Sequence, residues 1–107
     1  MEDKNENIKV AIAAEKDNID AMICPTAGRT PYFLLFEDKK LVKVIKNPFA
    51  KGSGGAGFSV AHMLAKENVG LVVAGKFGSN MIPVLEEKGI KYKEIPNKTI
   101  KQAFEVL

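Results

Sequence analysis

Cysteine and long apolar runs are both scarce in this sequence, and each scarcity excludes a class of protein. Cys24 is the only cysteine among the 107 residues, so no disulfide can form within the chain, and this usage fits a reducing compartment. The longest apolar runs, residues 32–36 and 71–74, are far shorter than the ~20 residues that a membrane-spanning helix needs. Residues 1–7 are charged and lack the apolar centre of a secretory signal, so we expect a flexible N-terminus there. We therefore expect a cytoplasmic protein with no membrane partner.

The familiar signatures of catalysis are missing as well. The expected strands at residues 8–14 and 70–75 contain no Asp or Glu, and the chain has no Walker motif and no Ser–His–Asp set. A sheet without carboxylates argues against a two-metal nuclease, because such an enzyme needs acidic side chains converging on its metal ions. We expect a protein that is not an enzyme.

Excess charge is small, which disfavours a nucleic-acid partner. The chain has 16 basic and 13 acidic residues, a formal net charge of +3. Many of the lysines lie on or beside strands expected at the edges of a sheet, where lysine prevents edge-to-edge association. These are Lys39, Lys40, Lys43, Lys46, Lys91 and Lys93. We therefore expect no nucleic acid among the partners.

The hydrophobic pattern that is present predicts alternating strands and helices. Thr99 and Gln102 form a capping-box signature at the start of the last helix, and Gly89 suits the end of the helix before it. The first strand reads as packed mainly on one face, and Phe58 falls on the apolar arc of the first helix. The expected strands are residues 8–14, 32–37, 41–46, 70–75 and 90–95, and the expected helices are residues 56–67, 80–88 and 100–107.

This order of elements predicts a single α/β domain over residues 1–107. The hairpin at residues 32–46 demands antiparallel pairing, whereas the later strand–helix–strand units demand parallel pairing. A mixed five-stranded sheet in the order 3-2-1-4-5, with helices on its faces, satisfies both. Ligands of open α/β sheets bind at the carboxyl ends of strands whose connections diverge. Three loops would converge there, at residues 15–31, 52–57 and 75–78.

The glycine-rich loop matches the letters of a dinucleotide-binding fingerprint but not its context. Residues 52–57 follow a hairpin strand, and no acidic residue ends the next strand, where Gly75 and Lys76 occur instead. Nucleotide binding is therefore disfavoured. Two interpretations stay open for Gly54, Gly55 and Gly57: close approach of backbone N–H groups to an anion, or a tight loop packed on the sheet.

The segment from Cys24 to Arg29 carries the most chemistry. A thiolate is a soft ligand suited to iron–sulfur or copper centres, and a neighbouring guanidinium favours the charged thiolate. One cysteine cannot hold an ordinary iron–sulfur cluster, which takes four, so a cluster would arrive preassembled or share a dimer. The alternative is an incidental buried cysteine. His62, the only histidine, is a candidate metal ligand or a solvated surface side chain.

An ordered set of segments resembles the dinitrogenase iron–molybdenum cofactor biosynthesis family over nearly the whole chain. The set comprises residues 8–14, Cys24-Pro25-Thr26-Ala27-Gly28-Arg29-Thr30-Pro31-Tyr32-Phe33, Asn47-Pro48, Gly54-Gly55-Ala56-Gly57, Ala74-Gly75-Lys76-Phe77-Gly78 and Lys88-Gly89-Ile90. The resemblance implies a ribonuclease H-like three-layer α/β fold and non-catalytic binding of an iron–molybdenum or iron–sulfur cluster or precursor. Members often read S-P-H-F-G-R at residues 24–29, so their His and Phe are Thr26 and Ala27 here.

Together the loops and the resemblance predict a carrier or scaffold in metallocluster assembly. Its partners would be cluster donor and acceptor proteins, and it would be a monomer or a weak homodimer. Two alternatives are a regulatory module that binds a small anion without metal, and a protein–protein adaptor. The expected cofactor-binding residues are Cys24, Thr26, Gly28, Arg29, Gly54, Gly55, Gly57, Gly75, Lys76 and Gly78, with Cys24 and His62 as metal ligands.

Overall fold

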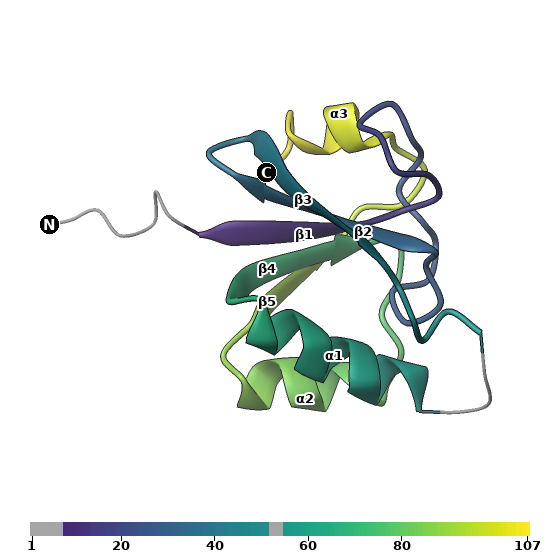
Figure 1. Cartoon of the computed structure of the whole chain (residues 1–107), viewed down its shortest axis with the longest axis vertical. Helices are drawn as coiled ribbons and strands as arrows, with labels where there is room; N and C mark the ends of the chain where they lie inside the picture. The colour runs from purple at the N-terminus through teal and green to yellow at the C-terminus, as the bar shows by residue number, and fades with distance from the viewer. Residues whose placement is uncertain (1–7, 52–54) are drawn as a thin grey trace, which may run out of the picture.

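A mixed β-sheet lies between two layers of helix (Figure 1). The computed structural model describes residues 8–51 and 55–107, so the expectations for residues 1–7 and for Gly54 lie outside the described residues. The strands are β1 (Lys9–Ala14), β2 (Tyr32–Glu37), β3 (Lys40–Lys46), β4 (Val69–Ala74) and β5 (Lys91–Glu94). The helices are α1 (Ala56–Lys66), α2 (Met81–Glu87) and α3 (Ile100–Ala103).

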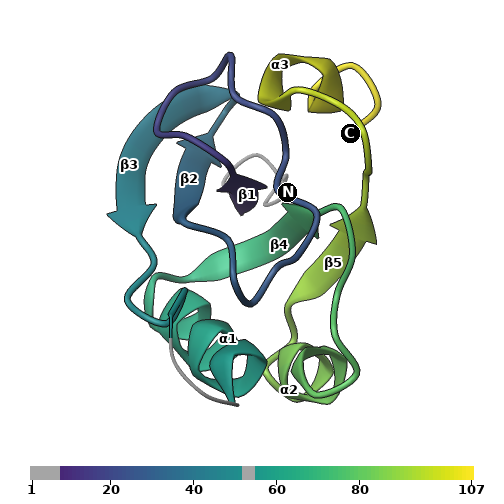
Figure 2. The same ribbon diagram turned by 90° about the vertical axis from the view of Figure 1, so that its right-hand side faces the viewer.

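The predicted strand order is confirmed. The five strands follow the order β3-β2-β1-β4-β5. β2 pairs antiparallel with both β1 and β3, whereas β4 pairs parallel with both β1 and β5. Figure 2 shows α1 and α2 on one face of this sheet and α3 on the other. The layers agree with the three-layer α/β prediction, while the ribonuclease H-like assignment stays a prediction.

The prediction that the first strand packs mainly on one face is wrong. The side chains of Ala11, Ile12, Ala13 and Ala14 all have no exposed surface. β1 is the middle strand of the sheet, so the helical layers cover both of its faces. Small alanines suit this position because they let both layers approach the strand closely.

Alternation along the strands divides the apolar side chains between two cores. On the α1 and α2 face, the largest strand contributions come from Phe33, Leu35 and Val72, which pack with helix residues such as Leu64 and Leu85. On the α3 face, Ile12, Leu34, Phe36 and Val73 pack with Ile23, Ile95, Ile100 and Ala103. The side-chain period of two along each strand therefore builds both layers from one sheet.

Two helix predictions require correction. Val60, Ala61 and Leu64 are buried as the periodicity of α1 predicts, but Phe58 is 54% exposed and its ring contacts that of His62. The capping box of Thr99 and Gln102 is confirmed, but α3 ends at Ala103 rather than continuing to the end of the chain. The next three residues form i→i−3 turns, and Val106 and Leu107 are left largely exposed, so their apolar side chains give little packing to support a further helical turn.

Lysines occupy both open edges of the sheet, as the sequence predicts. Lys40, Lys43 and Lys46 lie on the edge strand β3, and Lys91 and Lys93 lie on β5. Edge lysines discourage pairing with another copy.

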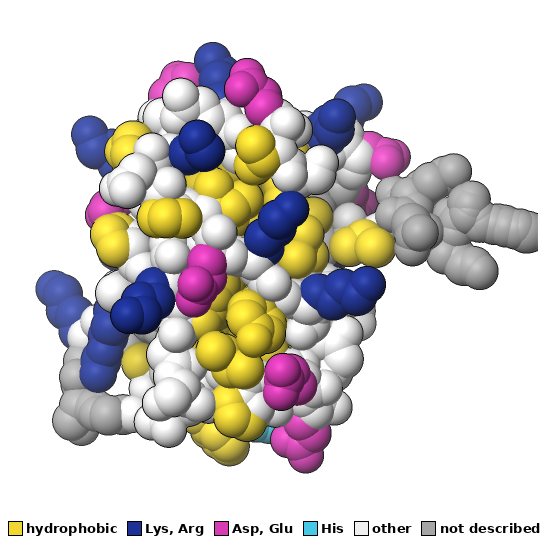
Figure 3. Space-filling model, turned by 180° about the vertical axis from the view of Figure 1, so that it is seen from behind, with side chains coloured by type: hydrophobic (Ala, Val, Ile, Leu, Met, Phe, Trp, Pro, Cys, Tyr) yellow, Lys and Arg dark blue, Asp and Glu magenta, His cyan; other side chains and the backbone are white. Residues whose placement is uncertain are grey.

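Figure 3 shows the side of the molecule behind Figure 1, where hydrophobic side chains form a band interspersed with charged ones. No helix in the described ranges 8–51 and 55–107 is long and apolar enough to cross a membrane.

The β2–β3 turn offers a stability test. Asp38 and Lys39 have φ values of 53° and 64°, the left-handed backbone conformation that residues other than glycine adopt at a cost in free energy. Lys39→Gly should raise the free energy of unfolding by about 0.5–1 kcal/mol, because relief of strain exceeds the extra unfolded-state entropy of glycine. Lys40→Gly, one residue into β3, should lower it instead. Urea unfolding of the two variants decides, and a loss of stability in both would contradict the turn geometry.

Candidate functional site

A cavity opens where the carboxyl ends of β1, β4 and β5 meet, as the switch-point argument predicts. Its volume is about 940 Å³, within the range of small-molecule sites. Four parts of the chain enclose it: the loop after β1, the loop after β4 that leads into α2, the first residues of α1, and the end of β5 with the residues that follow it. Eight of the twenty lining residues have apolar side chains, among them Met22, Pro25, Phe77 and Met81, and four more are glycines.

The loop after β1 enters the sheet itself at the switch point. The Cys24 N–H donates to the Ala13 carbonyl at 2.9 Å, and the Cys24 carbonyl accepts from the Gly75 N–H at 2.9 Å. Farther along, the Ala27 N–H donates to the Lys76 carbonyl at 3.1 Å. Backbone hydrogen bonds thus fix the segment between the ends of β1 and β4, and residues 25–29 of this fixed backbone line the cavity.

Glycines set how closely the walls approach one another. A Cβ on Gly75 would lie 2.8 Å from the Pro25 Cα, a distance that real Cβ contacts do not reach. A Cβ on Gly28 would lie 3.2 Å from the backbone nitrogen of Gly57, at the start of α1. The sequence identified these glycines as ligand-approach sites, but in the structure Gly75 and Gly28 first of all let two backbones meet.

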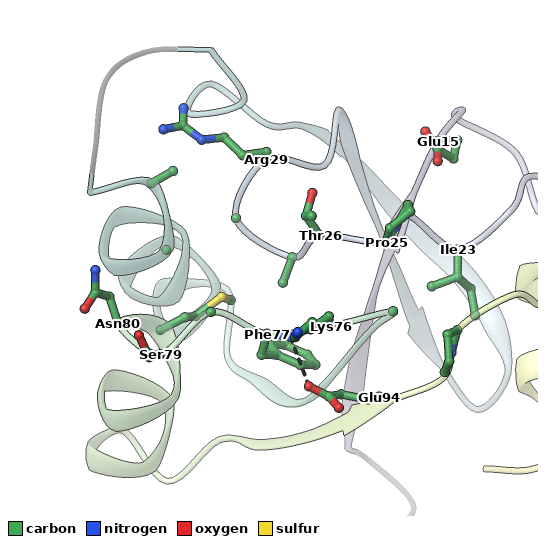
Figure 4. A pocket seen from close by; sticks show the side chains of 18 of the residues that line it. Glu15, Ile23, Pro25, Thr26, Arg29, Lys76, Phe77, Ser79, Asn80 and Glu94 are labelled. Atoms are coloured by element: carbon green, nitrogen blue, oxygen red, sulfur yellow. Dashed lines mark hydrogen bonds between the residues drawn. The ribbon is translucent and has the colours of Figure 1, made fainter.

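Charged side chains are distributed unevenly around the cavity. The charged residues that line it are Arg29, Lys76, Glu15 and Glu94. Figure 4 shows Arg29 on the side of the helices, where Ser79 and Asn80 also lie farther down, and the two glutamates on the opposite side. The Glu94 carboxylate accepts a hydrogen bond from the Phe77 N–H at 3.1 Å, so part of its charge is already engaged.

Most of the sequence-predicted site residues line this cavity, but four do not lie among its described walls. The lining includes Thr26, Gly28, Arg29, Gly57, Gly75, Lys76 and Gly78. Gly55 is the exposed N-cap residue of α1, Gly54 lies outside the described residues, and Cys24 and His62 lie elsewhere.

Cys24 is placed in the core behind the cavity wall. Its side chain is only 6% exposed and belongs to the apolar cluster on the α1 and α2 face. The Cys24 Sγ atom lies 4.0 Å from the Thr26 Oγ1 atom, and the neighbours Ile23 and Pro25 line the cavity while Cys24 does not. The alternation of a strand-like segment explains this placement, because adjacent side chains point to opposite sides.

His62 lies on α1, away from the cavity. Its ring contacts that of Phe58 with the centroids 4.5 Å apart, and six residues of helix, about 9 Å, separate it from the cavity-lining start of α1. Among the described residues, no three His, Cys, Asp or Glu side chains gather closely enough to hold a metal ion. The two predicted metal ligands thus both lie outside the cavity lining, Cys24 in the core and His62 on α1.

Sequence reasoning missed several residues that line the cavity. Glu94, Phe77, Ser79 and Met81 come from the end of β5 and the approach to α2. Glu94 could have been found, since it ends a strand predicted to be parallel to β4 and so points to the same edge of the sheet.

Comparison with known proteins places this fold among relatives. A family model described as dinitrogenase iron-molybdenum cofactor matches residues 8–107. The apo form of the orange protein (ORP) from Desulfovibrio gigas is similar, with a TM-score of 0.84 and 27% identity over 91% of this chain and 83% of that one. A putative NifB protein from Thermotoga, assigned to the DUF35 family, has a TM-score of 0.78 and 22% identity over 92% and 85% of the two chains. No curated protein matches the sequence.

The contact between Gly75 and Pro25 predicts a marked effect of a single methyl group. Gly75→Ala should lower the free energy of unfolding by about 1–3 kcal/mol, because the new Cβ meets backbone rather than a flexible side chain. Gly78→Ala is the matched control, since a Cβ there meets nothing within 4 Å and should change stability little. Equal stability of the two variants in chemical denaturation would show that the loop after β1 does not pack on β4.

Proposed function

The chain belongs to the dinitrogenase iron-molybdenum cofactor family, and we propose that it binds a preassembled metal–sulfur cluster or cluster precursor as cargo. The cargo would occupy the cavity at the carboxyl edge of the sheet and pass between donor and acceptor proteins of cluster assembly. The protein would bind this cargo without catalysing a reaction on it, and it would act in the cytoplasm.

The observation that carries this proposal is the kind of group that lines the cavity. Arg29 and Lys76 supply positive charge, and no described group of three ligating side chains is available to complete the coordination of a bare metal ion. A cluster that already carries its own sulfide and other ligands needs charge and shape complementarity instead. Metal–sulfur anions of this kind suit a guanidinium and an ammonium group with backbone N–H donors nearby.

The start of α1 adds to this donor set. Gly55 at its N-cap provides no side chain to satisfy the first backbone N–H groups, and Ala56 and Gly57 line the cavity. These unsatisfied N–H groups, together with the helix dipole, favour negative charge nearby. Arg29 lies on the same side, so the negative part of the cargo would sit there, away from Glu15 and Glu94.

Family membership and the solved relatives support the same class of ligand. The relative with 27% identity is described as an apo form, the state of a protein without its ligand. The family model is named for the iron–molybdenum cofactor. A volume of about 940 Å³ suits a cluster or a medium-sized anion better than a single ion.

A second candidate function is supported by the same absence of ligating groups. A small organic or phosphate anion would need only the cations and the backbone donors, without metal. In that case the protein would be a regulatory module rather than a carrier. The two candidates differ in whether a metal–sulfur anion binds in preference to an oxyanion.

Binding of tetrathiomolybdate, a simple metal–sulfur dianion, tests the proposal. We expect an absorbance titration to show stoichiometric binding by the wild type. The dissociation constant of Arg29→Ala should be higher by about tenfold or more, because a charged hydrogen-bond donor is lost. Lys91→Ala removes the same charge on the edge strand β5, outside the cavity, and should bind like the wild type.

Parallel titrations with orthophosphate and citrate distinguish the candidates. Tight binding of either oxyanion with none of the thiomolybdate would favour the regulatory module. Equal losses in Arg29→Ala and Lys91→Ala would indicate general electrostatic attraction and would overturn the assignment of the cavity as the site.

Substitution of Cys24 tests whether the cluster is bound by electrostatic attraction to the cavity wall or by coordination to the thiolate. Because its side chain packs in the core, Cys24→Ala should bind tetrathiomolybdate within about threefold of the wild type, while losing about 1–2 kcal/mol of stability from the smaller buried side chain. Cys24→Val keeps the apolar volume and controls for packing. Loss of binding in both variants at unchanged folding would show that the thiolate is a ligand.

A further inference from the structure

A buried amide joins the end of β3 to the cavity loop. Thr30 and Asn47 are the two buried polar side chains in the described part of the chain, and Asn47 is only 5% exposed. Asn47 directly follows β3, whose carboxyl end lies at the same edge of the sheet as those of β1 and β4. A buried amide must be well hydrogen-bonded to be tolerated, so its partners indicate what it holds.

The Asn47 side chain grips the backbone on both sides of Arg29. Its Nδ2 donates to the Gly28 carbonyl at 3.1 Å and to the Thr30 carbonyl at 2.9 Å. Its Oδ1 accepts from the Phe49 N–H at 2.9 Å, and its own backbone N–H donates to the Pro31 carbonyl at 2.9 Å. Both hydrogen bonds of the NH₂ group thus act on residues 28–30, while the side-chain oxygen is satisfied by Phe49, two residues after Asn47.

These contacts fix the residue that separates the two carbonyls. Arg29 lies between Gly28 and Thr30, so one NH₂ group holds the carbonyl of the residue before it and the carbonyl of the residue after it. Gly28 also packs against the backbone of Gly57 at the start of α1. The guanidinium is therefore carried by a backbone that is fixed relative to the helix, on the cavity side shown in Figure 4.

We propose that Asn47 is a positioning residue that presents Arg29 to the anionic cargo. The identity of the ligand rests on the proposed function. The clamp, by which we mean the two hydrogen bonds from the Asn47 Nδ2 atom to the Gly28 and Thr30 carbonyls, rests on those bonds alone. The amide is well suited to the role: aspartate at this position would place an oxygen against two carbonyl oxygens, and serine would be too short to reach both. Preorganisation of a cation in this way improves binding because less ordering is needed when the ligand arrives.

Limited trypsin digestion tests the clamp without any ligand. The Arg29–Thr30 bond should resist cleavage in the wild type and should be cut about tenfold faster or more in Asn47→Ser, since release of two hydrogen bonds opens the loop locally. Cleavage after Lys39 in the β2–β3 turn is the internal reference and should not change. Asn47→Asp keeps the bond from the Phe49 N–H but lacks the donors, and it should behave like Asn47→Ser.

Val69→Ala controls for a general loss of stability. Val69 is buried at the first residue of β4, at the end of the sheet opposite to the cavity. This variant should lower global stability without accelerating cleavage after Arg29 relative to cleavage after Lys39. If Asn47→Ser and Val69→Ala change both cleavage rates in the same proportion, the clamp proposal is overturned.

A double-mutant cycle on tetrathiomolybdate binding then asks whether Asn47 acts through Arg29. Asn47→Ser should weaken binding about fivefold or more in the wild-type background and less than twofold in the Arg29→Ala background. An equal loss in both backgrounds would overturn the positioning role even if the wild type binds well. If the wild type itself fails to bind, the proposed function and the presentation of Arg29 to this cargo both fail, while the digestion still decides whether the clamp exists.

Discussion

The insertion of the loop after β1 between the ends of two parallel strands is the interaction on which the rest of the site depends. Cys24 bonds through its backbone to Ala13 on one side and to Gly75 on the other, at the switch point where ligands of open α/β sheets bind. The chain itself therefore fills the innermost part of this crevice. The cavity is displaced outward, between the inserted loop, the start of α1 and the residues after β4, and this displacement decides which side chains a ligand would meet.

That insertion explains why Cys24, the only thiol, is not on the cavity wall. A backbone bonded on both sides behaves like a strand, so adjacent side chains face opposite ways. The single thiol of Cys24 points into the apolar core, whereas its direct neighbours Ile23 and Pro25 line the cavity. The wall of the site consequently offers the cations Arg29 and Lys76, opposed by Glu15 and Glu94, with close backbone approach but no described group of three metal-ligating side chains, a combination that suits a ligand bringing its own coordination shell.

Support for the loop comes from elements that are distant in sequence. Asn47, at the end of the edge strand β3, hydrogen-bonds to carbonyls of residues 28 and 30, and the Thr30 hydroxyl lies 3.0 Å from the carbonyl oxygens of both Ala14 and Tyr32. Glu94, at the end of β5, accepts from the Phe77 N–H on the other wall. Residues at the ends of several strands therefore hydrogen-bond to the backbone that forms the cavity walls. These bonds fix the walls relative to the rigid sheet.

The sequence by itself determined the order of strands and helices, the sheet topology and the edge at which a site would form, because hydrophobic periodicity and hairpin spacing are local signals that admit few topologies. It also identified all four glycines that line the cavity, together with Arg29 and Lys76. Only the tertiary structure decided that Cys24 is turned into the core, that His62 lies along α1, and that Asn47 grips the backbone around Arg29. The physical reason is that a side chain's direction in an irregular loop, and a hydrogen bond across many residues, depend on which backbones pack together, and no local pattern records this.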